Sequence, residues 1–251
     1  MADKPFSSKQ IVVCLPTYNE AQNLIRIAGA ILEALPRASI LIVDDNSPDG
    51  TGKLADKLAT ENRSISVLHR PSKAGLGRAY LNGFHTILDN SNADLIVQMD
   101  ADLSHPPEKL PGMIHSTADA DLVIGSRYVA GGSTKNWGVL RKWVSRFGSF
   151  YARLWLGINI RDFTGGFKIW RRELLEKVLS NPISSEGYIF QVETTYIASR
   201  LGALITEFPI VFAERETGKS KMTLQIVFEA FWQLPLIRFK TYRAARKRKQ
   251  M

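Results

Sequence analysis

Short apolar runs alternate with amphipathic stretches through the first half of this chain. Five runs rich in Ile, Val and Leu predict buried strands at residues 10–15, 40–43, 65–68, 95–99 and 122–124. The stretches between them carry apolar residues at helical spacing, which predicts helices at 20–35, 51–61, 74–89 and 107–118. This alternation predicts an α/β fold with a mostly parallel sheet flanked by helices. Ligands of such folds bind outside the carboxyl ends of the strands, so a site is expected there.

Carboxylates crowd three of these predicted strand ends. The first strand runs into PTYNE, the second into DDNSPDG and the fourth into DAD. Five acids are therefore expected at one edge of the sheet: Glu20, Asp44, Asp45, Asp100 and Asp102. The first strand-to-helix turn has no G-x-G-x-x-G, and the chain has no G-x-x-x-x-G-K-[ST]. A dinucleotide-binding dehydrogenase and a P-loop NTPase are therefore both disfavoured.

The pair Asp100 and Asp102 is the sharpest indication of a metal site. In an extended segment residues two apart point the same way, so both carboxylates can hold one cation. Oxygen ligands without His or Cys favour Mg²⁺ or Mn²⁺, usually completed by substrate phosphates and water. The alternative is a pair of solvated loop aspartates. His105 follows the pair and is expected to reach a metal only through water, and the other histidines are expected to have a structural role.

Charge is distributed unevenly along the 251 residues, whose formal net charge is +9. Residues 236–251 hold seven bases and no acid, and residues 135–172 hold nine bases and one acid. The rest of the chain is therefore acidic, with a net charge of −6. Such a distribution indicates two basic surfaces that meet anionic partners.

Cysteine content and hydropathy point to a cytoplasmic protein. The single cysteine, Cys14, excludes an intramolecular disulfide and a thiolate metal cluster. No stretch reaches the roughly 18 apolar residues that a membrane span requires, and the first ten residues lack the apolar region of a signal peptide.

The motifs together resemble those of inverting, metal-dependent glycosyltransferases of the Rossmann-like GT-A fold. PTYNE, DDNSPDGT, KAGLGRA and MDADLSHPPE occur in that order. GSRY, RDFTGGFK, EGYIFQVE and ERETGKSKM look like the catalytic chains of dolichol- or polyprenol-phosphate mannosyltransferases, in glycosyltransferase family 2. The resemblance runs from about residue 11 to residue 237.

This resemblance implies GDP-mannose as donor and a polyprenyl or dolichyl phosphate as acceptor. By position, the guanosine would be held by Pro16, Tyr18, Glu20, Val43 and Asp45. The diphosphate would lie by Asp100, Ala101 and Asp102, of which the two aspartates would bind the metal. Donor phosphates or reacting groups would meet Arg127, Arg215 and Lys221. Asp102 and Arg127 are the expected catalytic residues.

The implied acceptor also bears on acid–base chemistry. A lipid phosphate is already anionic near neutral pH, so no essential catalytic base is expected. Cations must instead hold it against the donor, and the candidates are Arg127, Arg141, Lys142, Arg146 and Lys168. Ser104 stands where some relatives ligate the metal through glutamine, so water is expected in that position. Gly166 stands where many relatives carry serine.

Two segments are expected to meet other surfaces. In 137–156, aromatic residues at helical spacing alternate with bases, which suits a helix at a membrane surface; the alternative is a solvated helix. After a catalytic domain at 1–221, residues 222–251 carry a narrow polar stripe and a basic end. This pattern predicts amphipathic helices that bind either an anionic membrane, at its cytoplasmic face, or a separate membrane subunit. The alternative is a core helix followed by a basic tail.

Two rival functions stay open at this point. One is an enzyme of the same fold that uses a UDP sugar such as UDP-glucose. It stays open because the shared motifs do not determine which nucleobase the sugar donor carries. The other is a non-catalytic module that binds nucleic acid or anionic membranes. That module would leave Asp100 and Asp102 without a role, and the chain lacks an RNA-binding aromatic signature, so nucleic acid is not an expected partner.

Overall fold

The structure is a computed structural model that describes residues 9–183, 185, 187–213, 234–235 and 238–239. Its nine strands are β1 (Ile11–Thr17), β2 (Ser39–Asp44), β3 (Ile65–His69), β4 (Leu95–Gln98), β5 (Leu122–Ser126), β6 (Ser133–Thr134), β7 (Lys168–Arg171), β8 (Ile205–Pro209) and β9 (Val211–Phe212). Seven of them form one sheet in the order β3-β2-β1-β4-β7-β5-β8, and β6 pairs with β9. All pairs are parallel except those of β7, which runs antiparallel to both β4 and β5. The predicted mostly parallel α/β sheet is therefore confirmed, while the reversed strand β7 was not predicted.

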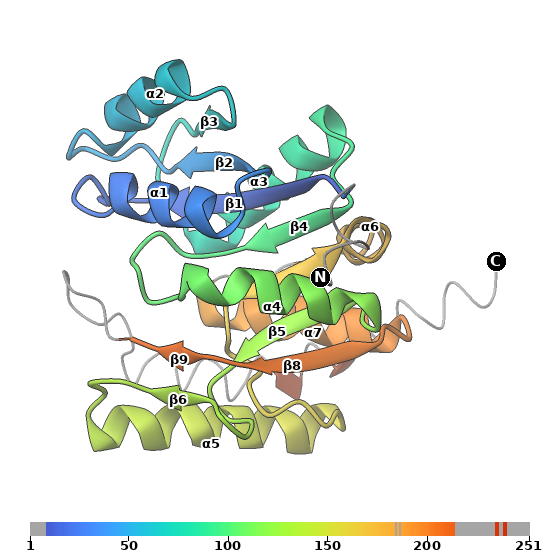
Figure 1. Cartoon of the computed structure of the whole chain (residues 1–251). Coiled ribbons are helices and arrows are strands. Elements are labelled where there is room, and N and C mark those ends of the chain that lie inside the picture. Colours follow the sequence, from blue (N-terminus) through green and yellow to red (C-terminus); the bar gives the residue numbers. More distant parts are fainter. Residues whose placement is uncertain (1–8, 184, 186, 214–233, 236–237, 240–251) are drawn as a thin grey trace, which may run out of the picture.

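Helices cover both faces of the large sheet, as Figure 1 shows. They are α1 (Leu24–Ala34), α2 (Thr51–Glu61), α3 (Leu76–Asn90), α4 (Leu110–His115), α5 (Val139–Leu156), α6 (Arg172–Leu179) and α7 (Gly187–Arg200). The predicted helix at 107–118 is divided into two short 3₁₀ turns, η1 (Pro107–Lys109) and η2 (Ser116–Ala118), around α4. The other three predicted helices match α1, α2 and α3 closely.

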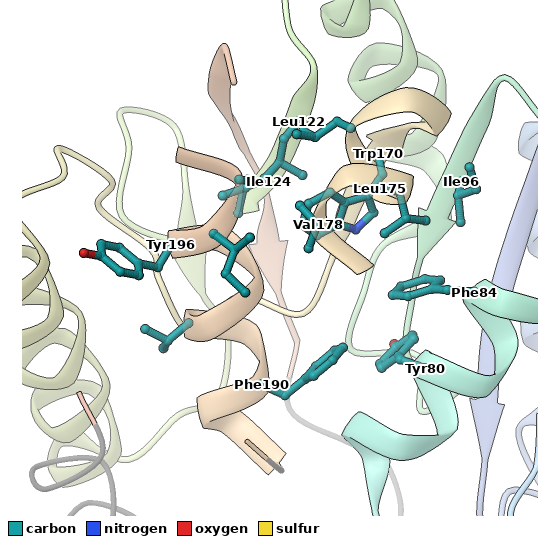
Figure 2. Packing of buried hydrophobic residues seen from close by; sticks show 14 of the residues in the cluster. Tyr80, Phe84, Ile96, Leu122, Ile124, Trp170, Leu175, Val178, Phe190 and Tyr196 are labelled. Carbon is teal, nitrogen blue, oxygen red and sulfur yellow. The ribbon is translucent and has the colours of Figure 1, made fainter. Parts of the chain in front are cut away.

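The core divides into two apolar layers because alternate residues of each strand face opposite sides of the sheet. Val13 and Leu15 of β1 pack with α1, α2 and α4, whereas Cys14 packs with α3 and α7. On this second side Tyr80 of α3 and Phe190 of α7 stack with ring centroids 6.1 Å apart, as Figure 2 shows. The second layer therefore joins the helix after the KAGLG loop to the helix of the EGYIFQVE motif.

Helix α3 lies unusually close to the sheet at Gly83. A Cβ atom at this position would clash with the Cys14 sulfur and lie 2.9 Å from Val43 Cγ2. Glycine therefore allows the helix to approach β1 and β2 directly. Burial in this contact raises the pKa of the Cys14 thiol, so the thiol stays protonated and inert.

The described residues of the C-terminal segment contact the main body. Leu234 is buried in the second core layer, and Arg238 donates a hydrogen bond to the Trp155 carbonyl oxygen at 2.7 Å. Among the described residues, every helix is too short or too polar to span a bilayer. The rest of the predicted segment 222–251 lies outside the described residues.

Candidate functional site

Strands β1, β2 and β4 bring the predicted acids to one edge of the sheet. Thr17 at the end of β1 pairs in register with Asp44 of β2, and the Met99 amide donates to the Cys14 carbonyl. The segments that follow these three strands therefore lie side by side. This is the edge at which open α/β sheets bind ligands.

The loop after β2 is held in shape by its own acids. Asp44 accepts hydrogen bonds from the Thr17 hydroxyl at 3.0 Å and from the Ser47 hydroxyl at 2.6 Å. Asp45 forms an ion pair with Arg70 and accepts from the Ala74 amide at 3.3 Å. Both carboxylates are almost fully buried, so these hydrogen bonds hold the loop in shape from within.

The loop after β1 presents the more accessible of the predicted nucleotide-binding residues. Tyr18 is partly exposed, and the Lys73 ammonium lies 3.7 Å from the centre of its ring. Glu20 is also partly exposed and accepts a hydrogen bond from the Asn23 amide group at 2.8 Å. The aromatic ring of Tyr18 suits stacking with a nucleobase, and the ammonium of Lys73 beside it suits a phosphate group.

Three other residues that are predicted to contact the donor have buried side chains. Val43 is fully buried in the core layer beneath α3, and Ala101 is 3% exposed. Pro16 is buried as well. A ligand at this edge would therefore meet these residues through their backbone, and their contact with the donor stays a prediction.

The two aspartates after β4 lie in a turn that is closed by their own neighbours. The Asp100 amide donates to His105 Nδ1 at 2.9 Å, and the Ser104 hydroxyl donates to Asp102 Oδ1 at 2.5 Å. Leu103, which lies between Asp102 and Ser104, has a left-handed φ of 62°. The turn is thus pre-shaped, which lowers the entropy cost of binding a ligand there.

Helix α3 adds a residue that the sequence analysis missed. The Tyr80 hydroxyl donates to Asp100 Oδ1 at 2.6 Å. Burial, followed by the charge of Asp100, raises the pKa of Tyr80 well above its usual value, and Asp102 contributes as well. The hydroxyl therefore keeps its proton and orients the carboxylate.

These residues fit a hard divalent cation with an incomplete protein shell. Asp100 and Asp102 supply carboxylate oxygens, and the Asp100 side chain is 20% exposed toward the edge of the sheet. Within the described ranges, no group of three or more His, Cys, Asp or Glu residues is arranged around a common metal position. Mg²⁺ and Mn²⁺ sites with one or two carboxylates are completed by substrate phosphates and water.

The neighbours of the pair have other partners. Ser104 uses its hydroxyl on Asp102, and it is 1% exposed. His105 stacks on Phe167 at 5.1 Å and points Nε2 toward Asp100 Oδ2, 4.0 Å away. Since Nδ1 accepts from the backbone, the neutral ring carries its proton on Nε2. Both residues therefore orient the aspartates, and whether they ligate a metal stays a prediction.

Arg127 is locked into an ion pair that the sequence analysis did not foresee. Its Nε and terminal nitrogen lie 2.7 and 2.6 Å from the two oxygens of Asp162, which is fully buried. The Thr164 hydroxyl accepts a further bond from the same group at 2.8 Å. Two parallel hydrogen bonds from the Arg127 guanidinium to the Asp162 carboxylate thus join the motifs GSRY and RDFTGGFK. Any phosphate that Arg127 binds would share it with Asp162.

Lys168 does not lie where a lipid phosphate could reach it. It is 0% exposed, and its ammonium donates to the backbone carbonyl and to Oε1 of Gln191, at 2.9 and 3.0 Å. Burial lowers the pKa of Lys168 to about 7. The expectation that Lys168 contacts the acceptor is therefore not supported, because the side chain of this strand residue points into the core.

Gln98 and Gln191 form a buried polar network around this lysine. The Trp170 indole can only donate, and it donates to Gln98 Oε1 at 3.1 Å. Gln98 Nε2 therefore donates to Gln191 Oε1, at 2.6 Å. This leaves Gln191 Nε2 facing Gly166, where a Cβ atom would lie 3.5 Å from it and 3.6 Å from Asp100 Oδ2. A glutamine inside the apolar run 95–99 was the signal for this network.

The remaining predicted cations lie on one side of the site or outside the described residues. Arg127 and Arg141 contact the same ring, with guanidinium carbons 5.3 and 4.0 Å from the centre of Trp137. Arg215 and Lys221 lie outside the described residues. The structure therefore brings Arg127 and Arg141 together and keeps Lys168 apart.

Known proteins resemble this chain over most of its length. The family model for glycosyl transferase family 2 matches residues 12–179. An undecaprenyl-phosphate mannosyltransferase of Micrococcus luteus is 47% identical over 221 residues, which cover 88% of this chain and 90% of that protein. A polyprenol monophosphomannose synthase of Mycolicibacterium smegmatis is 45% identical over 229 residues, covering 90% and 86%.

Solved structures support the fold. Glucosyl-3-phosphoglycerate synthase from Mycobacterium tuberculosis, in complex with Mn²⁺, uridine diphosphate and glucosyl-3-phosphoglycerate, matches with a TM-score of 0.65. The alignment covers 93% of this chain and 80% of that chain at 19% identity. A second crystal structure of that enzyme, in complex with phosphoglyceric acid, matches with a TM-score of 0.64. The arrangement of the sheet and its helices is thus the GT-A fold.

Proposed function

This chain belongs to glycosyl transferase family 2, and on that premise we propose that it transfers mannose from GDP-mannose to a polyprenyl phosphate. The product would be the β-linked mannosyl lipid phosphate, formed by direct displacement with inversion. The observation that carries the proposal is the placement of Asp100 and Asp102 beside the PTYNE and DDNSPDG loops, in a chain 45–47% identical to two polyprenyl-phosphate mannosyltransferases.

Each part of the edge has a distinct task in this reaction. Tyr18, Glu20 and the buried Asp45 would form the nucleoside side, together with backbone of Pro16 and Val43. Asp100, the Ala101 backbone and Asp102 would lie at the diphosphate. A divalent cation bound by the two aspartates would neutralise charge that develops on the leaving diphosphate. Arg127, Arg215 and Lys221 would hold donor phosphates and the acceptor.

The acceptor side is proposed to rest on arginine. Arg127 and Arg141 flank Trp137, and Arg127 is held at a defined position by Asp162. Two negatively charged reactants repel each other, so fixed cations that bring them together lower the barrier.

No side chain is proposed to act as an essential base, because the nucleophile is an anionic phosphate oxygen. Replacing Glu20 with Gln should weaken donor binding without abolishing turnover, whereas Asp102→Asn should abolish it. Single-turnover rates at saturating donor would separate these effects. A non-ligand acid whose loss stops turnover while GDP and metal binding persist would overturn this part.

A donor panel tests the function itself. Purified protein is incubated with Mn²⁺ or Mg²⁺, polyprenyl phosphate and labelled GDP-mannose, GDP-glucose or UDP-glucose, and the lipid fraction is counted. We expect label from GDP-mannose alone, with none after addition of EDTA or in the Asp102→Asn variant. Label from UDP-glucose alone would select the rival UDP-sugar enzyme, and no transfer from any donor would contradict the proposal.

Association with a membrane surface completes the proposal, because the acceptor is a lipid. Residues 222–251, almost all outside the described residues, are proposed to form an amphipathic and basic segment after a catalytic domain at 1–221. This segment would lie peripherally on the cytoplasmic face of an anionic membrane or against a separate membrane subunit.

A further inference from the structure

A buried amide group beside Asp100 has a hydrogen-bond donor that the described protein does not use. Gln191 of α7 is 3% exposed, and its Oε1 accepts hydrogen bonds from Gln98 Nε2 at 2.6 Å and from Lys168 Nζ at 3.0 Å. Among the described residues, none accepts a hydrogen bond from Gln191 Nε2. A buried donor without an acceptor destabilises a protein, so its presence indicates that this amide serves a bound group.

The chemistry of its neighbours determines the orientation of this amide. The Trp170 indole can only donate, and it donates to Gln98 Oε1, so Gln98 turns its Nε2 toward Gln191. Lys168 donates to the same Gln191 oxygen. A flipped Gln191 would place its NH₂ group against these two donors. Gln191 therefore presents Nε2, and not Oε1, on the side of Gly166.

Glycine at position 166 leaves room next to this donor. An added Cβ would lie 3.5 Å from Gln191 Nε2 and 3.6 Å from Asp100 Oδ2, and the His105 ring borders the same position at 3.4 Å. We call this space the Gly166 recess. Gly166 is partly exposed and the Asp100 side chain is 20% exposed, so a ligand at this edge of the sheet can reach the recess.

The Gly166 recess lies where the two sides of the candidate site meet. Asp100 belongs to the turn that is proposed to hold the donor diphosphate. Thr164, two residues before Gly166, accepts a hydrogen bond from the Arg127 guanidinium at 2.8 Å. Direct displacement places the reacting sugar carbon between the leaving diphosphate and the attacking phosphate. The hexose that is transferred would therefore lie at the recess.

Two polar groups of the recess select the kind of atom that binds there. The Gln191 amide offers a donor on one side, and the Asp100 carboxylate offers an acceptor on the other. A hydroxyl group can accept from the first and donate to the second at once. A phosphate oxygen would be repelled by the carboxylate, and an apolar group would leave the amide unpaired. Asp100 has enough lone pairs to accept from Tyr80 and to bind a cation as well.

From these observations we propose that Gln191 is a specificity-determining residue, which binds one hydroxyl group of the transferred hexose in the Gly166 recess. Its Nε2 donates to the hydroxyl oxygen, and the hydroxyl donates to Asp100 Oδ2. Gln98 and Lys168 hold the amide in this orientation from the core side. The inference deepens the proposed function and rests on it, because the hexose is the part of GDP-mannose that GDP lacks.

Equilibrium binding separates a contact with the hexose from a contact with the nucleotide or the metal. Titration calorimetry of the full chain would compare GDP with GDP-mannose, each with Mn²⁺ and without acceptor. Gly166→Ala adds one methyl group to the recess at a position whose φ is not left-handed, so the fold should be kept. We expect this variant to bind GDP like the wild type and GDP-mannose at least ~10-fold more weakly. Gly29→Ala, with no atom near an added Cβ, should bind both like the wild type.

Donor analogues test whether Gln191 meets a single hydroxyl group. Gln191→Met keeps the length of the side chain and removes the amide. Its matched control is Thr194→Val, at a residue of the same helix that is 1% exposed and lies 3.5 Å from Lys168 Nζ. The ratio kcat/KM would be measured with GDP-mannose and with analogues that lack the hydroxyl at C2, C3, C4 or C6. We expect Gln191→Met to lose about 10–100-fold with every donor except one analogue, with which the loss should largely disappear.

Three results would overturn the inference. They are unchanged GDP-mannose binding by Gly166→Ala, an equal weakening of GDP and GDP-mannose, or a loss in Gln191→Met that is the same with all donors. Gly166→Ala keeps every hydrogen bond of the network, so it decides the question even if Gln191→Met does not fold. These results would leave the proposed transfer reaction standing, whereas a donor panel without transfer would contradict that reaction itself. If the panel selects another sugar nucleotide, the same comparison is made with that donor and its nucleotide.

Discussion

Tyr80 shows how one residue can couple the helical layer to the metal-binding aspartates. Its ring packs between Phe84 and Phe190, while its hydroxyl reaches Asp100 at 2.6 Å. Tyr80→Phe keeps the ring and removes the hydrogen bond. We expect the Mn²⁺ concentration for half-maximal activity to rise about 10-fold, with a loss of about 1 kcal/mol in stability.

The matched control for this prediction is Tyr196→Phe, in the same core layer and 4% exposed. Metal titrations of activity and urea unfolding would be run on both variants. An unchanged metal requirement in Tyr80→Phe, or an equal change in Tyr196→Phe, would contradict the orienting role of Tyr80.

Lys168 predicts a pH dependence of stability. Its pKa is lowered by burial to about 7 in the folded chain, against 10.5 as its ordinary value. Below pH 7 the ammonium is charged in both states, and its burial penalty is fully present. Between pH 7 and 10.5 the unfolded chain binds more protons, so the free energy of unfolding rises with pH, by about 1.4 kcal/mol per unit.

Lys168→Met should remove this slope. Urea unfolding at pH 7 and pH 9 is expected to show a wild-type minus variant difference that grows by about 2–3 kcal/mol. Lys57→Met, at a side chain that is 70% exposed, should leave the profile unchanged. Parallel pH profiles for the wild type and Lys168→Met would show that the buried group does not titrate in this range.

Individual residues also mark how far the candidate site could be predicted. The strand-end acids follow from chain order alone, since parallel strands end at one edge. The burial of Val43 and Lys168 could not be predicted, because it depends on which way a strand residue faces in the finished sheet. The partnership of Arg127 with Asp162 joins segments 35 residues apart, and no local pattern indicates it.

At the scale of elements, the contact of α3 with β1 gives a test of packing. Gly83→Ala introduces a methyl group against Cys14 and Val43, and it should destabilise the protein by about 1–3 kcal/mol. Gly29→Ala is the matched control, because Gly29 is an exposed residue of α1 with no atom within 4 Å of an added Cβ. It should stabilise by up to about 1 kcal/mol. Urea unfolding would measure both, and equal effects would contradict the close approach.

The elements that could be predicted are those with a strong local pattern. Strands β1 to β5 and helices α1 to α3 carry clear apolar periodicity. The four-residue strand β7 did not show one, because the charged residues Lys168 and Arg171 stand at its two ends and leave only two apolar residues. In α5 the helical period was predicted, but the period alone did not show that Phe147 and Leu154 are exposed. Periodicity reveals a stripe and not the direction in which it points.

At the scale of the whole molecule, ligand binding should raise stability. With GDP and Mn²⁺ at about 100 times the dissociation constant, the free energy of unfolding is expected to rise by about 2.7 kcal/mol. Scanning fluorimetry would compare GDP, UDP and each nucleotide with EDTA. We expect a shift from GDP that EDTA removes, and a larger shift from UDP than from GDP would contradict the proposed donor.

The reversed strand β7 has a consequence for the order of assembly. Strands β3, β2, β1 and β4 are complete by Gln98, and they pair only with one another and with β7. Strand β5 pairs only with β7 and β8, both of which come later in the chain. On the ribosome, β5 must therefore wait some 40 residues for its first partner. We expect the nucleotide half of the sheet to form during synthesis, and the arginine half to close onto it only after β7 has emerged.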